Sequence, residues 1–204
     1  MIKSVSVWAI RCALVLLVVG CNRNSPSPGL PIPNYAALKP DQLSLKQADL
    51  ELAGTNYKAD IVQKRNGADL QIDLTAEGQT IESERYRSDD RSFSVTDAGG
   101  ERFEPPITLI KYPMSVGDGW TWTGNLLTGP EPHKATATVS TSTVDQTLIG
   151  GVVHGVVKIQ VDLAIDSGRP SEPSKRKLVF YIAPNMGVVR REFGDYSTRK
   201  PLEQ

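Results

Sequence analysis

Apolar and polar residues alternate in short runs from Tyr57 onward, and turn signals separate the runs. Alternation of this kind is typical of a strand with one buried face. The longest run spans residues 157–165, where every second residue is Val, Ile or Leu. Asn66-Gly67 lies between two runs and favours a type I′ hairpin, because both central residues of that turn need positive φ. The alternation predicts a mostly β domain, a curved antiparallel sheet or half-barrel of about nine or ten strands.

Residues 41–53 are less regular, because their leucines fit neither a helical nor a strand period. Asp41 can cap a short helix that runs to about Ala48, with Leu50 and Leu52 entering a strand. We therefore expect one short N-terminal helix before the sheet. At the other end of the domain, the polar tail from Gly194 is expected to fray.

The first 20 residues have the layout of a secretory signal peptide. Lys3 and Arg11 carry its only charges, and its apolar run ends at Gly20, which is small enough for a cleavage site. The run, about a dozen residues, is shorter than the roughly 20 that a transmembrane helix needs. The end of the run, Val18-Val19-Gly20-Cys21, resembles the lipobox of bacterial lipoproteins. An uncleaved transmembrane helix and an ordinary secreted protein are the alternatives.

The lipobox resemblance implies that Cys21 is diacylated, that the leader is cut before it, and that the new amine is usually acylated as well. Three acyl chains exceed the two signals that stable anchoring takes, so the expected partner is the membrane, bound through lipid on Cys21. In Gram-negative lipoproteins, Asp after the cysteine favours retention in the inner membrane. Asn22 stands there instead, which implies the outer membrane, facing the periplasm, if the source is Gram-negative.

The chain after the leader divides into a tether and a domain. Residues 21–40 are rich in proline, which favours an extended, semi-rigid spacer. Residues 41–204 are expected to form a single antiparallel β domain. This domain is expected to contain no cysteine, since Cys12 lies in the leader and Cys21 carries lipid. Disulfides and thiol chemistry are therefore excluded from it.

Charge excludes a further class of partners. The whole chain has 23 basic and 23 acidic residues, and without Lys3 and Arg11 the balance is about −2. The two signs are interleaved along the chain, so we expect no nucleic-acid partner. The dense patch Lys175-Arg176-Lys177 precedes a strand-like run, and we interpret it as a solvated strand end rather than a phosphate site.

Two stretches resemble a set of exported bacterial proteins, mostly of uncharacterised function. Their first hallmark, Pro-Leu-x-x-Gly-x-x-Trp, matches residues 113–120, with Met114 in place of Leu. Their second, Tyr-Ala-x-x-x-Gly-x-Val-Lys, matches residues 181–190, with Ile182 inserted and Arg190 in place of Lys. The resemblance implies a curved antiparallel sheet like the half-barrel of lipoprotein-localisation carriers. It implies no reaction and no catalytic residues.

Candidate chemistry is sparse. His133, expected in a loop, and His154, expected at a strand end, have no Cys, carboxylate or second His at a metal-ligand spacing. Asp89-Asp90 is simplest as a turn, because adjacent strand residues face opposite sides. Asp118, between two glycines, is expected to accept hydrogen bonds from its own turn. We therefore predict no metal, no cofactor and no enzymatic activity, while a triad assembled only in space stays open.

One strand offers a candidate binding surface, since Trp120 and Trp122 point to the same side. This Trp face could stack a sugar or, with Leu178 and Phe180, line an apolar pocket, although two tryptophans on one face usually belong to the core. The favoured function is a membrane-anchored lipoprotein that binds an apolar ligand or an envelope protein on its sheet face. A purely structural envelope lipoprotein with protein partners is the alternative, and a hydrolase with an unrecognised triad is the third hypothesis.

Overall fold

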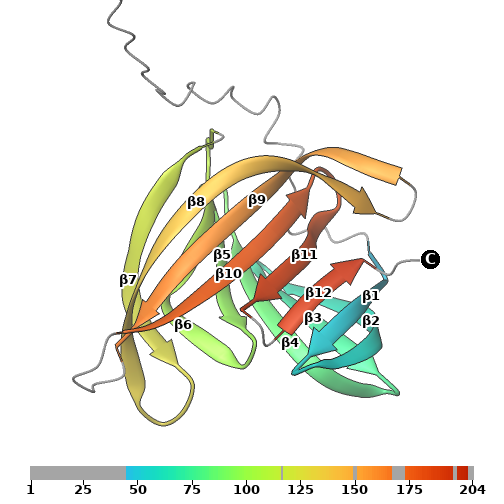
Figure 1. Cartoon of the computed structure of the whole chain (residues 1–204), viewed down its shortest axis with the longest axis horizontal. Helices are drawn as coiled ribbons and strands as arrows, with labels where there is room; N and C mark the ends of the chain where they lie inside the picture. The colour runs from blue at the N-terminus through green and yellow to red at the C-terminus, as the bar shows by residue number, and fades with distance from the viewer. Residues whose placement is uncertain (1–44, 116, 149–150, 167–172, 195–196, 202–204) are drawn as a thin grey trace, which may run out of the picture.

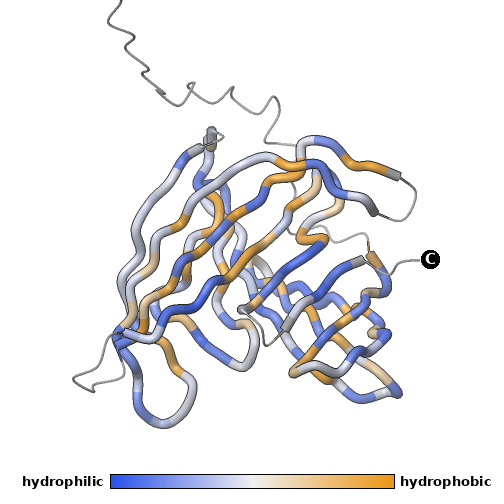
Figure 2. Tube along the Cα trace, in the orientation of Figure 1, coloured by the Kyte–Doolittle hydropathy of each residue, from blue (hydrophilic) through white to orange (hydrophobic). Residues whose placement is uncertain are grey.

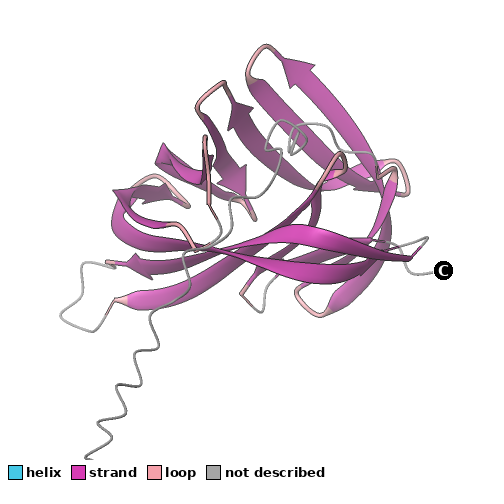
Figure 3. Cartoon of the chain, turned by 90° about the horizontal axis from the view of Figure 1, so that it is seen from above, coloured by secondary structure: helices cyan, strands magenta, loops and turns pink. Residues whose placement is uncertain are grey.

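The computed structural model describes residues 45–115, 117–148, 151–166, 173–194 and 197–201. The leader, the lipobox with Cys21 and the tether lie outside these described residues. The described chain consists of strands and the loops that join them (Figure 3). None of the described residues forms a helix that is long and apolar enough to cross a membrane.

Twelve strands follow one another along the described chain (Figure 1): β1 (Gln47–Leu52), β2 (Thr55–Asn66), β3 (Asp69–Ala76), β4 (Gln79–Ser88), β5 (Ser92–Ala98), β6 (Glu101–Lys111), β7 (Gly119–Leu127), β8 (Pro132–Leu148), β9 (Gly151–Ile165), β10 (Ser174–Ala183), β11 (Gly187–Phe193) and β12 (Ser197–Pro201). Each strand pairs antiparallel with the next, and β12 pairs with β1, so the sheet closes into a barrel. The mostly β prediction is confirmed. The prediction of a half-barrel with nine or ten strands is wrong.

The two strands that close the barrel have the weakest sequence patterns. β1 begins at Gln47, so the predicted helix is wrong at Gln47 and Ala48, while Asp41 lies outside the described residues. β12 occupies the tail that was expected to fray. Its residue Arg199 is fully buried, at 0% exposure, and a charge at a buried position hides a strand from any search for alternating apolar residues.

The hairpin predicted at Asn66-Gly67 joins β2 and β3, but its turn differs from the predicted one. Asn66 pairs with Asp69, so Gly67 and Ala68 are the central residues. Gly67 alone of the two has positive φ, at 59°. That is the pattern of a type II′ turn, which needs positive φ only at its first central residue.

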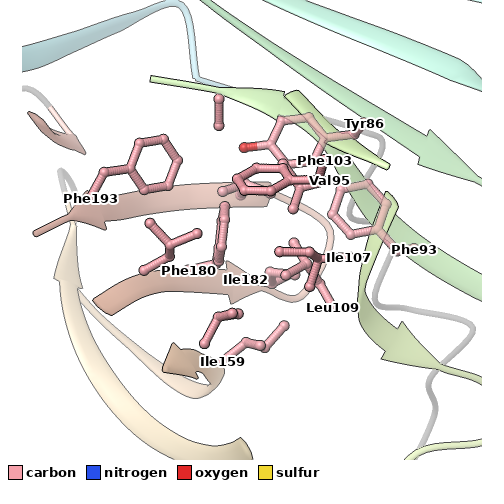
Figure 4. Packing of buried hydrophobic residues seen from close by; sticks show 14 of the residues in the cluster. Tyr86, Phe93, Val95, Phe103, Ile107, Leu109, Ile159, Phe180, Ile182 and Phe193 are labelled. Atoms are coloured by element: carbon pink, nitrogen blue, oxygen red, sulfur yellow. The ribbon is translucent and has the colours of Figure 1, made fainter. Parts of the chain in front are cut away.

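The predicted alternation is visible along most strands, where hydrophobic and hydrophilic residues follow one another (Figure 2). Most buried apolar residues face the barrel interior, where their aromatic rings meet (Figure 4). A second, smaller buried cluster, separate from this core, consists of Val156, Val179, Tyr181, Ala183 and Val189. Tyr86 on β4 contacts Phe180 on β10 with ring centroids 6.4 Å apart, although these strands lie on opposite sides of the ring of twelve. The interior of a barrel widens as strands are added, and a barrel of about eight strands is just wide enough for side chains to fill it. A round barrel of twelve strands would be wider than that. The barrel is therefore flattened, with opposite walls in contact.

The wall is split between β6 and β7, which pair only from Arg102 to Glu104. Two indole N–H groups of β7 bridge the split. Trp120 donates to the Thr108 carbonyl over 2.9 Å, and Trp122 donates to the Pro105 carbonyl over 3.0 Å. These side chains supply donors to carbonyls that would otherwise lack a ladder partner on this side.

Gly124 makes the bridged split possible, because a Cβ there would lie 2.5 Å from the Glu104 carbonyl oxygen and 2.5 Å from the Trp122 ring. We expect Gly124→Ala to destabilise the protein by about 1–3 kcal/mol, since the backbone of β6 must move to relieve the overlap. The check is the urea midpoint. Gly129→Ala is the matched control, because nothing lies within 4 Å of its added Cβ. Equal midpoints for the two variants would contradict this account of the split.

Candidate functional site

The four residues proposed as a ligand face all belong to the inner wall. Trp122, Leu178 and Phe180 are buried, and Trp120 is partly buried against the core. Trp120 and Leu178 stand in one row of the sheet, separated by Val139 and Val161 on the intervening strands. The ring of Trp122 packs edge-on against Phe103 with centroids 6.4 Å apart. Core packing and the bridging of β6 to β7 thus occupy the Trp face.

The predicted turns at aspartates are confirmed. Asp89 Oδ1 accepts hydrogen bonds from the backbone N–H groups of Arg91 and Ser92, each over 2.8 Å, and these bonds lower the Asp89 pKa. Asp118 Oδ2 accepts one from the Ser115 N–H over 2.6 Å. Both carboxylates therefore hold loops in place.

The two histidines lie on neighbouring strands. His133 lies on β8 rather than in the expected loop, and His154 lies within β9. His154 Nδ1 is 3.1 Å from Asp145 Oδ2, and both side chains are largely exposed, at 77% and 61%. Within the described residues, no three His, Cys, Asp or Glu side chains gather as a metal site.

A buried charge cluster inside the barrel was missed by the sequence reasoning. Glu84 on β4, Arg191 on β11 and Arg199 on β12 are each 0% exposed. Glu84 Oε1 accepts from Arg191 Nε over 2.7 Å and from Arg199 Nε over 2.9 Å. Glu84 Oε2 accepts from Arg199 Nη2 over 3.1 Å and from the Tyr86 hydroxyl over 2.6 Å. Glu82 extends the cluster, with Oε2 2.5 Å from Arg191 Nη2.

The cluster is electrically balanced, with two carboxylates facing two guanidinium groups. Burial alone raises the pKa of Glu84, but Arg199 and Arg191 outweigh it and hold that pKa at about 2. Burial and the neighbouring Glu84 carboxylate raise the pKa of Tyr86. Glu84 is thus a fixed anion and Tyr86 a fixed donor, which suits a structural network better than proton transfer. The only sequence signal is the spacing of Glu82, Glu84 and Tyr86, which places all three on one face of β4.

A pocket opens at the end of the barrel where β5 turns into β6 and where β10 begins. This mouth pocket has a volume of about 670 Å³. Ala98, Phe103, Leu178 and Phe193 supply its apolar lining. Its charged lining consists of Glu101, Lys175, Arg176 and Lys177. Of the four residues of the predicted ligand face, Leu178 lines it.

Two further pockets lie elsewhere on the barrel. The larger, about 560 Å³, lies over β2 to β6, and three of its cations have internal partners: Lys64 pairs with Asp73, Arg87 with Asp69 and Arg102 with Glu104. The smaller, about 390 Å³, lies between β4 and the tip of the β5–β6 hairpin and reaches Glu82. Neither is lined by a residue of the predicted ligand face.

Comparisons with known proteins leave the family open. No family model matches the chain, and no curated protein matches it. One solved structure, from Bacteroides fragilis, is described as that of an inferred exported protein with a YmcC-like fold. It is 15% identical, covers 79% of this chain and 97% of its own, and superposes with a TM-score of 0.43.

Glu84→Gln tests the buried charge cluster. The substitution leaves two buried guanidinium groups facing a neutral amide, and breaking one partner of a buried pair typically costs about 3–5 kcal/mol. We expect the urea midpoint to fall accordingly. Asp69→Asn is the control, because it removes the exposed pair with Arg87 and should leave the midpoint close to that of the wild type. A Glu84→Gln midpoint as high as that control would show that the cluster does not hold the barrel.

Acid should weaken the fold in a defined window. The pKa of Glu84 falls from the ordinary 4.5 to about 2, and that of Asp73 from 3.8 to about 2, where burial is outweighed by hydrogen bonds from Gln71, Ser83 and Lys64. The unfolded chain therefore takes up protons first, so the stabilisation is complete above pH 4.5 and is lost as the pH falls towards about 2. Urea midpoints across this window should decline, and Asp73→Asn should decline less steeply. A flat wild-type profile would refute the assignment.

Proposed function

We propose that the protein is a bacterial lipoprotein, anchored by lipid on Cys21, whose non-catalytic barrel binds an apolar ligand in the mouth pocket. The anchor rests on Val18-Val19-Gly20-Cys21 at the end of a short apolar leader, and Asn22 favours the outer membrane, facing the periplasm, in a Gram-negative source. The resemblance of residues 113–120 and 181–190 to exported bacterial proteins supports the same compartment.

The mouth pocket is the observation that carries the binding function. Ligand sites are concave and about 300–1,000 Å³ in volume, with an apolar lining that carries a few polar groups. The mouth pocket is concave and of this size, and its lining combines four apolar side chains with four charged ones. The interior beyond it is filled by aromatic rings and by the buried charge cluster. A ligand is therefore received at the end of the barrel and not on the Trp face.

The alternative, a purely structural lipoprotein with protein partners, finds less support in the described surface. Large apolar side chains exposed there are Val62, at 40%, and Val152, at 55%. Single exposed residues of this kind are normal, whereas docking faces are contiguous apolar patches. The hydrolase hypothesis is weaker still, because neither His133 nor His154 lines any of the three pockets described above.

Cys21→Ser tests the anchor. We expect it to abolish labelling by radioactive palmitate and to block cleavage of the leader, because no thiol remains to be acylated. Cys12→Ser is the matched control, since Cys12 lies in the leader that is removed. Labelling that persists in Cys21→Ser, or that disappears in Cys12→Ser, would contradict the lipobox assignment.

Ser174→Phe tests the binding site. Ser174 is exposed and lines the mouth pocket, so a ring there should narrow the entrance without disturbing the core. The full-length lipoprotein is purified in detergent, and organic extracts are compared by mass spectrometry at equal protein amounts. We expect an apolar molecule to co-purify with the wild type and with Thr138→Phe, an exposed site on β8, but to be depleted from Ser174→Phe. Extracts that are the same for all three proteins would contradict the assignment of the mouth pocket as the binding site.

A further inference from the structure

The charged lining of the mouth pocket is unbalanced. The lining contains three cations, Lys175, Arg176 and Lys177, and a single carboxylate, that of Glu101, which leaves a formal charge of +2. The whole chain, by contrast, has equal numbers of basic and acidic residues. Cations concentrated around a concave, low-dielectric lining create a positive potential that attracts anions. The patch interpreted from sequence as a solvated strand end thus lies partly at the entrance of a pocket.

Arg176 is the member of the patch that belongs to the inner face. It precedes Leu178 and Phe180 at every second position of β10, while Lys175 and Lys177 are exposed. Its Nη1 donates to Glu101 Oε1, and this ion pair joins β10 to β6, two strands that are not neighbours in the sheet. The side chain of Arg176 is 38% exposed and that of Glu101 is 11% exposed. The guanidinium is therefore held at the entrance but remains reachable from solvent.

We propose that the mouth pocket takes an amphiphile with a single acyl chain and an anionic head, and that Arg176 binds the head in place of Glu101. This inference rests on the proposed function, because it names the ligand class of the same site. The Glu101 carboxylate marks the position that a ligand carboxylate or phosphate would take, since guanidinium groups bind both through the same planar donors. The acyl chain lies along Phe103, Leu178 and Phe193.

The two partners of the ion pair then have opposite effects on binding. Removing the guanidinium removes the group that binds the head. Removing the Glu101 charge frees Arg176 and raises the local positive charge, so it should favour the ligand. A merely structural ion pair would not produce opposite effects, because either substitution would break the same bridge between β10 and β6.

The test uses the full-length lipoprotein in detergent micelles at neutral pH. Two diazirine photoprobes, a palmitate and the matched hexadecanol, are titrated, and labelling is read from the intact mass and mapped to peptides. We expect the palmitate probe to label mouth-pocket peptides at about tenfold lower concentration than the alcohol, a preference that salt weakens. Arg176→Gln should erase the preference, Glu101→Gln should increase it, and Lys111→Gln, a cation outside this pocket, should leave it unchanged.

The outcomes separate the two proposals. If neither probe labels the mouth pocket, the proposed function and the inference both fall. If both probes label it equally and the charge variants change nothing, the binding site stands and the anionic head is refuted. Equal urea midpoints show that the variants are folded, and the opposite sign expected for Glu101→Gln keeps the test decisive if Arg176→Gln is unstable. Competition by unlabelled palmitate and by lysophosphatidate shows whether the head is a carboxylate or a phosphate.

Discussion

The carboxylate of Glu84 is the interaction on which the closed barrel depends. It receives hydrogen bonds from arginines on β11 and β12, so one buried anion ties β4 to strands that follow it by more than a hundred residues. Buried ion pairs are weak evidence for stability, but they penalise any arrangement that breaks them. A one-residue slip of β12 would turn Arg199 to the outer face and leave Glu84 short of a partner. We therefore hypothesise that the buried charge cluster specifies the register in which β12 closes the barrel.

Closure and flattening decide where a ligand can bind. Because Tyr86 and Phe180 meet across the interior, the middle of the barrel has no room for another molecule. The split between β6 and β7 is bridged by the two tryptophans, which removes a second potential entrance. What remains is the end of the barrel, where the β5–β6 hairpin and the start of β10 surround the mouth pocket.

The sequence predicts those parts of the fold in which apolar residues alone fill the inner positions. The runs at β2, β3, β9 and β10 were identified because Ala, Ile, Leu, Val and Phe alternate there with polar residues. Closure could not be predicted, because the inner residue of β12 is Arg199 and a buried arginine is satisfied only by a partner distant in sequence. For the Trp face, the sequence predicts the position of the side chains but not their role. Its side chains were identified correctly as sharing one side, but their role as donors to β6 depends on a split that no local pattern records.

Burial separates the arginines that hold the barrel from the one that is available to a ligand. Arg191, Arg199 and Arg176 all extend from inner positions of neighbouring strands, and each contacts a glutamate. The first two are 0% exposed, so exchanging their partner would require a charge to lose its counter-ion inside the protein. Arg176 is 38% exposed at the end of the same barrel, where water can solvate Glu101 once it is displaced. An arginine–glutamate pair is thus a permanent structural contact at the centre of the barrel and an exchangeable contact at the mouth pocket.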